Sequence, residues 1–250
     1  MAIDWPKPVM VFTDQGLCRL FKKKGITIVM RARNPLALAL SGVIAAMTLG
    51  HGSAFGGPMT RSEIIQKIEA SALELEIGSI FELELGEPPQ IDGDEFTITP
   101  EGSQQFAMDG SGGTFNLMPD GRILLIDSEG SFGIVASDFN ELVAIATGLP
   151  SWRDALRFVG EPDLRQARAA WAAYVQQWGL DEALSKPWPY ESGGYSVATP
   201  GAAREAIRKR LRVETSADPF AVLYRALNEL NDGVAVSWQG EPLFLFGRQR

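Results

Sequence analysis

Histidine and cysteine are nearly absent from this chain of 250 residues, which contains only His51 and Cys18. Histidine is the usual general base near neutral pH, and cysteine is the strongest side-chain nucleophile. Beyond His51, their absence therefore excludes the usual serine and cysteine triads, redox dithiols and zinc sites. A single cysteine also excludes a disulfide framework within the chain.

Motifs of enzymes that need neither residue are missing too. The chain has no P-loop and no dinucleotide-binding glycine fingerprint, and residues 59–250 contain neither GxSxG nor SxxK. Asp127 and Glu129 could form a carboxylate pair like that of glycosidases, although many other pairs in the chain would serve equally. A carboxylate-based hydrolase is thus the remaining enzymatic alternative, and we expect no catalytic residues, cofactor or metal.

Basic residues are scarce in most of the chain. The net charge is −8, but residues 1–58 carry +5 (7 Lys and Arg, 2 Asp and Glu) and residues 59–250 carry −13 (16 against 29). Between residues 63 and 129, only Lys67 and Arg122 oppose fifteen acidic residues. Such a surface repels phosphate backbones, so we expect no nucleic-acid binding. It attracts a basic protein partner, with a merely soluble acidic protein as the simpler alternative.

The apolar run at 35–49 is too short to span a bilayer comfortably, so we expect no stable membrane span. Because Arg31 and Arg33 precede it, the run suits the hydrophobic region of a signal peptide. Gly52-Ser53-Ala54 then offers small residues for cleavage before Phe55. This interpretation predicts an exported acidic protein of unknown binding role, periplasmic or secreted after cleavage near Ala54.

Two other interpretations of residues 1–58 stay open. Translation could begin at Met59, which would make the protein cytoplasmic, the localisation that we favour. Alternatively, residues 1–58 form a βαβ-like unit with strands at 9–13 and 26–30. In each case residues 59–250 read as one domain, without internal repeats or low-complexity linkers.

A helix capping box and an alternation of apolar and acidic residues mark the first elements of this domain. Thr60 and Glu63 form a capping box that predicts a helix to about Ala72. Residues 73–77 and 81–85 alternate between apolar and acidic, which predicts two strands with Glu82 and Glu84 on a solvated face. This face, continued by a polar turn at 92–95, is the predicted partner-binding acidic edge; protection of a sheet edge is the alternative. Its residues are Glu82, Glu84, Asp92, Asp94 and Glu95.

The clearest pattern in the chain is a hairpin. Strands are predicted at 114–118 and 122–126 around the turn Pro119-Asp120-Gly121, with a third strand at 132–136. Asp138 and Glu141 then predict a helix through about Thr147.

Helices dominate the remainder. An aromatic stripe on a helix from about Pro162, with Trp171, Tyr174 and Trp178, predicts a core-facing surface. Asp218 opens a last helix, and residues 234–238 and 243–246 predict a closing hairpin. The fold class is therefore α+β, a single domain with a central, mostly antiparallel sheet flanked by helices.

This hairpin and helix resemble the SUKH superfamily over residues 113–158. The family pattern is met by Asp120-Gly121-Arg122, by Val135-Ala136-Ser137 and by Phe139-Asn140-Glu141-Leu142. The resemblance implies an α+β fold and a non-enzymatic binding role, since many bacterial members are immunity proteins that neutralise toxins. An acidic immunity protein against a basic toxin would fit the charge of residues 59–250.

Overall fold

The computed structural model describes residues 58–85, 96–188 and 194–248, and the backbone of three strands nearer the N-terminus. Contacts divide the chain into two units, Met1–Gly56 and Gly57–Arg250. The apolar run at 35–49, the cleavage site at 52–54, and Asp92, Asp94 and Glu95 lie outside the described residues. The predictions that rest on them stay predictions.

The first unit contains a three-stranded antiparallel sheet of β1 (Met10–Thr13), β2 (Gly16–Lys23) and β3 (Ile26–Val29). The strands expected near 9–13 and 26–30 are present, but the βαβ arrangement is wrong. A third strand lies between them, because connections of two residues suit antiparallel hairpins and leave no room for a crossover helix.

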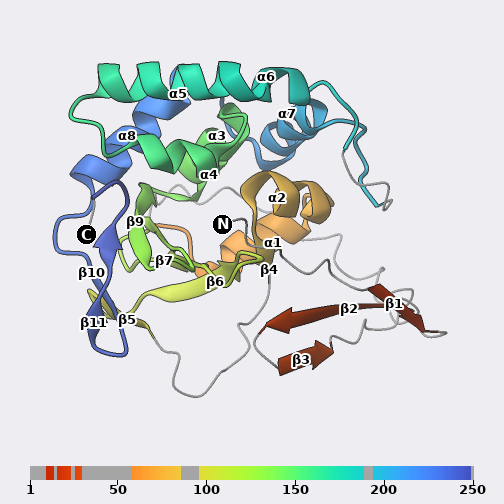
Figure 1. Ribbon diagram of the computed structural model, residues 1–250, viewed down its shortest axis with the longest axis horizontal. Coiled ribbons are helices and arrows are strands. Elements are labelled where there is room, and N and C mark those ends of the chain that lie inside the picture. Colours follow the sequence, from red (N-terminus) through yellow and green to blue (C-terminus); the bar gives the residue numbers. More distant parts are fainter. Residues whose placement is uncertain are drawn as a thin grey trace, which may run out of the picture. The chain divides into compact units, whose positions relative to one another are not determined.

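The second unit is built on a six-stranded sheet in the order β12-β9-β8-β7-β6-β4 (Figure 1). All neighbouring strands are antiparallel except β9 and β12, which are parallel. The hairpin around Gly121 is confirmed, and the third strand and the α+β fold class are confirmed with it. The strands are β4 (Glu84–Leu85), β6 (Gln104–Met108), β7 (Thr114–Leu117), β8 (Ile123–Ile126), β9 (Ser131–Ala136) and β12 (Phe244–Leu245).

Both faces of the central sheet are covered, which explains why all four residues of β8 are buried and apolar. Ile123 and Leu125 face the helices in the main core, and Leu124 and Ile126 face a smaller core on the other side. That smaller core includes Val236 from β10 (Ala235–Trp238), which pairs with β5 (Phe96–Thr99) and β11 (Glu241–Pro242).

The predicted closing hairpin is therefore only partly correct. β10 turns into β11 as expected, but the chain then crosses to the central sheet, where β12 pairs with β9. Short strands cannot be assigned to a partner from local pattern alone, because alternation indicates a strand and not its neighbour.

Near the start of the unit, α1 (Arg61–Glu69) begins at the predicted capping box, in which Glu63 N donates to Thr60 Oγ1 at 3.3 Å. The strand predicted at 73–77 is wrong, since residues Glu74–Phe81 form α2, and only Glu84–Leu85 of the strand predicted at 81–85 is present, as β4. Ile77, Ile80 and Phe81 are spaced for one helical face and are buried. Leu75, which completed the apparent alternation, is 56% exposed.

The other helices lie on one face of the sheet (Figure 1). The predicted helix after Asp138 is α3 (Phe139–Gly148), and Asp138 Oδ1 accepts from Glu141 N at 2.8 Å. The remaining helical elements are α4 (Trp152–Ala155), a 3-10 turn (Leu156–Phe158), α5 (Leu164–Trp178), α6 (Leu180–Ala183), α7 (Pro200–Leu211) and α8 (Pro219–Glu229). None of the described helices has the length and hydrophobicity needed to cross a bilayer.

Candidate functional site

The predicted acidic edge is not a strand face in the structure. Glu82 lies at the C-terminus of α2 in a left-handed conformation, and Glu84 lies on β4, at the edge of the central sheet. Both residues are exposed, but only Glu84 belongs to a strand. The proposed grouping of Glu82 with Asp92, Asp94 and Glu95 stays a prediction, because the last three are outside the described residues.

The structure groups Glu82 with different charged residues. Although Glu82 as a whole is exposed, partial burial of its carboxylate raises its pKa, and the charges of Asp154 and Asp109 add to this effect. Arg153 opposes the shift. No local pattern indicated this grouping, since the residues belong to the end of α2, the turn after β6, and α4.

Asp109 organises the turn between β6 and β7. Its Oδ1 accepts from Ser111 N at 2.9 Å, Ser111 Oγ at 2.7 Å and Gly113 N at 2.7 Å. Its Oδ2 binds Arg153 Nη2 at 2.5 Å. Burial alone would raise the pKa of Asp109, but the hydrogen bonds from Ser111 and Gly113 and the charge of Arg153 lower it overall. This carboxylate therefore has a structural role, and Ser111 serves the turn.

The residues considered for a hydrolase are also engaged in a turn. Asp127 Oδ1 accepts from Glu129 N at 3.0 Å and from Ser131 N at 2.7 Å, closing the connection between β8 and β9. The Glu129 side chain is exposed. The hydrolase alternative stays a prediction.

A buried arginine holds the C-terminal end of α3. Arg204 on α7 donates to the carbonyls of Ala146 at 2.7 Å, Pro150 at 2.8 Å and Leu149. Arg208, one turn later, donates to Thr147 O at 3.1 Å. The last carbonyls of a helix have no partner within it, so cations placed here satisfy them and complement the negative end of the helix dipole.

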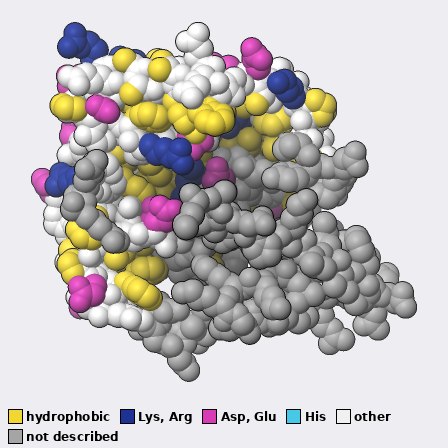
Figure 2. Space-filling view, in the orientation of Figure 1, with side chains coloured by type: hydrophobic (Ala, Val, Ile, Leu, Met, Phe, Trp, Pro, Cys, Tyr) yellow, Lys and Arg dark blue, Asp and Glu magenta, His cyan; other side chains and the backbone are white. Residues whose placement is uncertain are grey.

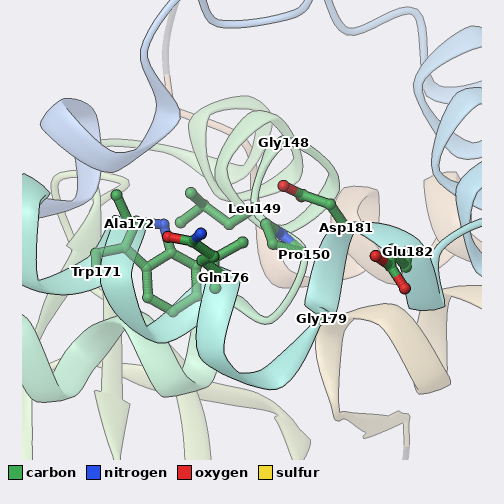
Figure 3. A pocket seen from close by; sticks show the side chains of 10 residues that line it. Gly148, Leu149, Pro150, Trp171, Ala172, Gln176, Gly179, Asp181 and Glu182 are labelled. Atoms are coloured by element: carbon green, nitrogen blue, oxygen red, sulfur yellow. The ribbon is translucent and has the colours of Figure 1, made fainter.

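The end of α3 also forms one wall of an open pocket (Figure 3), with a volume of about 500 Å³. Leu149 and Pro150 supply this wall, and Trp171 and Val175 of α5 supply the apolar wall opposite. Ring stacking positions Trp171, which lies parallel to Phe220 with centroids 6.1 Å apart.

Polar groups are confined to the margin of this pocket. Gln176 lies above the Trp171 ring, while the Asp181 carboxylate lies toward the opposite end and Glu182 lies farther out (Figure 3). Asp181 and Glu182 form no ion pair with any residue that the structure describes. An apolar interior with two unpaired carboxylates at its margin is suited to a cation that carries an apolar stem.

This pocket was not predicted from the sequence, because its walls come from two separate segments, 148–150 and 171–182, which only tertiary packing brings together. The aromatic stripe of α5 was the available signal, and it was only partly interpreted correctly. Trp171 is buried, whereas Trp178, predicted to face the core, is 63% exposed at the end of the helix.

Figure 2 shows how charge is distributed on one face of the described structure. Acidic and basic side chains are interspersed there, and hydrophobic side chains lie in a band beside α5. The acidic excess thus does not form one continuous patch among the described atoms of this face.

Metal-ligating side chains are not clustered in the described residues: no group of three or more His, Cys, Asp or Glu could hold a metal ion there. No protein-family model, curated protein or solved structure matches the chain.

Proposed function

We propose that the chain is a non-enzymatic protein-binding domain whose partner is basic. The observation that carries this proposal is the charge of residues 59–250, which is −13, from 16 Lys and Arg against 29 Asp and Glu. Among the described residues, ion pairs engage five carboxylates: Asp109, Asp120, Glu141, Asp154 and Asp218. The other described carboxylates form no ion pair with a described residue, and of these Glu76 is buried and accepts from Ser196 N and Val197 N.

The resemblance to the SUKH superfamily supports the same class of function and suggests a toxin as the partner. The residues that carry the resemblance have structural roles. Asp120 pairs with Arg122 at 2.6 Å, and Arg122 also donates to Leu230 O at the end of α8. Val135, Ala136, Phe139 and Leu142 belong to the core. Recognition would then depend on surface residues outside the matched pattern.

The proposal is tested by capture from cells of the native host. The full chain is added as bait to a host-cell lysate of low ionic strength and cross-linked to the proteins that bind it. The captured proteins are identified by mass spectrometry. We expect a basic protein, enriched over the yield obtained with an unrelated acidic protein of similar net charge. Enrichment of acidic proteins alone, or of the same proteins on both baits, would contradict the proposal.

A further inference from the structure

The pocket between the end of α3 and helices α5 and α6 lies outside the predicted acidic edge, and it has features that a flat acidic surface lacks. We infer that it receives an arginine side chain of the basic partner, an inference that rests on the proposed function. The shape of the pocket, the chemistry of its walls and the charge at its margin support this assignment.

Shape and wall chemistry suit a long side chain with an apolar stem. A hollow of about 500 Å³ is large enough for one complete arginine side chain. Leu149, Pro150, Trp171 and Val175 offer apolar contact to its methylene groups. An aliphatic partner residue would fill this space equally well, so the walls alone do not select a cation.

The negative charge at the margin of the pocket favours a cationic side chain over an aliphatic one. Asp181 and Glu182 are consecutive residues at the margin, with the Asp181 carboxylate toward the pocket and Glu182 farther out (Figure 3), and neither has an ion-pair partner among the described residues. The Asp181 carboxylate can accept two parallel N–H donors from one planar guanidinium, whereas an ammonium offers its three donors from a single point. This favours arginine over lysine.

The buried cation Arg204 does not pair with the carboxylates at the margin of the pocket. Arg204 approaches the same wall, but its guanidinium donates to the carbonyls of Ala146, Leu149 and Pro150 and is not among the residues that line the pocket. Those carbonyls, at the negative end of α3, stabilise its positive charge. The two marginal carboxylates remain the charged groups that face the pocket.

The probe that tests the inference is a fluorescein-labelled peptide in which three arginines alternate with glycine. Citrulline and lysine versions of the same peptide serve as ligand controls, because citrulline keeps the shape of arginine without its charge. The dissociation constant for the full chain is measured by fluorescence anisotropy. We expect affinity in the order arginine, lysine, citrulline.

Two matched pairs of variants separate the pocket from the general acidic charge. Ala172→Trp fills the pocket, whereas Ala173→Trp adds the same side chain to a neighbouring exposed position of α5 that does not line it. Asp181→Asn/Glu182→Gln removes the marginal charges, whereas Glu229→Gln/Asp232→Asn removes two exposed charges elsewhere. Equal thermal midpoints within each pair establish that folding is not the cause of a difference.

We expect Ala172→Trp and Asp181→Asn/Glu182→Gln each to raise the dissociation constant about tenfold, and each control to change it less than about twofold. Equal effects within both pairs would overturn the inference. If the pocket variants leave peptide affinity unchanged while the full chain still captures a basic protein, only the pocket assignment fails. If no basic protein is captured, the proposed function fails as well.

Discussion

At the scale of single residues, Arg204 is the least expected feature. It is buried, and its pKa is lowered to about 10, chiefly by burial and also by the charge of Arg208. It therefore remains cationic at neutral pH, held by main-chain carbonyls instead of a carboxylate. Charge-assisted hydrogen bonds of this kind offset part of the cost of burying the ion.

Arg204→Met should lower the free energy of unfolding by about 3 kcal/mol, because it leaves buried carbonyls without donors. Arg210→Met, at an exposed position of the same helix, is the matched control and should change it by less than about 0.5 kcal/mol. Urea denaturation of both variants measures the difference. Equal midpoints would show that Arg204 is not needed to close the end of α3.

The lowered pKa of Asp109 makes an acid-dependent contribution to stability. The folded state favours the ionised carboxylate, so the contribution is present above the ordinary pKa of 3.8 and is lost as pH falls through the folded value. Asp109→Asn should be less stable than the unmodified protein at pH 7, and the difference should shrink as the solution is acidified. Thermal melting across this range measures it, and a difference that is constant with pH would contradict the assignment.

Glu82 is a control for Asp109, because its pKa is shifted in the opposite direction. Its pKa is raised in the folded state, so the ionised form opposes folding at neutral pH, and this unfavourable contribution disappears below the ordinary pKa of 4.5. Glu82→Gln should therefore raise the thermal midpoint at pH 7 and lose that gain on acidification. A variant that is less stable than the unmodified protein at pH 7 would contradict it.

At the scale of elements, caps and turns were the predictable features. Thr60, Asp138 and Asp218 each begin a helix as expected. A short polar side chain at this position accepts a hydrogen bond from a backbone N–H of the first turn. The spacing of apolar residues was a less reliable guide to the type of element. Residues 73–81 fit both an alternating and a helical pattern, and burial of Ile77, Ile80 and Phe81 favours the helix.

Close packing of α8 on β9 depends on a residue without a side chain. A Cβ added at Gly133 would lie 2.5 Å from Leu227 Cδ2, whereas one added at Gly110 meets nothing within 4 Å. We expect Gly133→Ala to lower the free energy of unfolding by about 1 to 3 kcal/mol by overpacking. Gly110→Ala is the control. Indistinguishable denaturation curves for the two variants would mean that α8 adjusts without cost.

At the scale of the whole molecule, the fold class was predictable and the candidate pocket was not. Hydrophobic pattern and turn chemistry depend on near neighbours, which suffices for a hairpin such as β7–β8. The pocket brings Leu149 and Trp171 together through tertiary packing. The grouping of Glu82 with Arg153 arises in the same way. No local signal in one sequence encodes contacts of this kind.

Net charge is the property of the whole molecule on which the proposed binding of a basic partner depends. A net charge of −13 over residues 59–250 should steer a basic partner, and salt should screen that attraction because the Debye length falls to about 3 Å at 1 M. A partner held mainly by apolar contact would bind with little dependence on salt.

The most direct test is therefore the dissociation constant of the full chain for its captured partner, measured from about 50 mM to about 500 mM sodium chloride. We predict that affinity falls at least about tenfold over this range, mainly through slower association. A dissociation constant that does not change with salt would contradict the proposal that acidic charge directs binding.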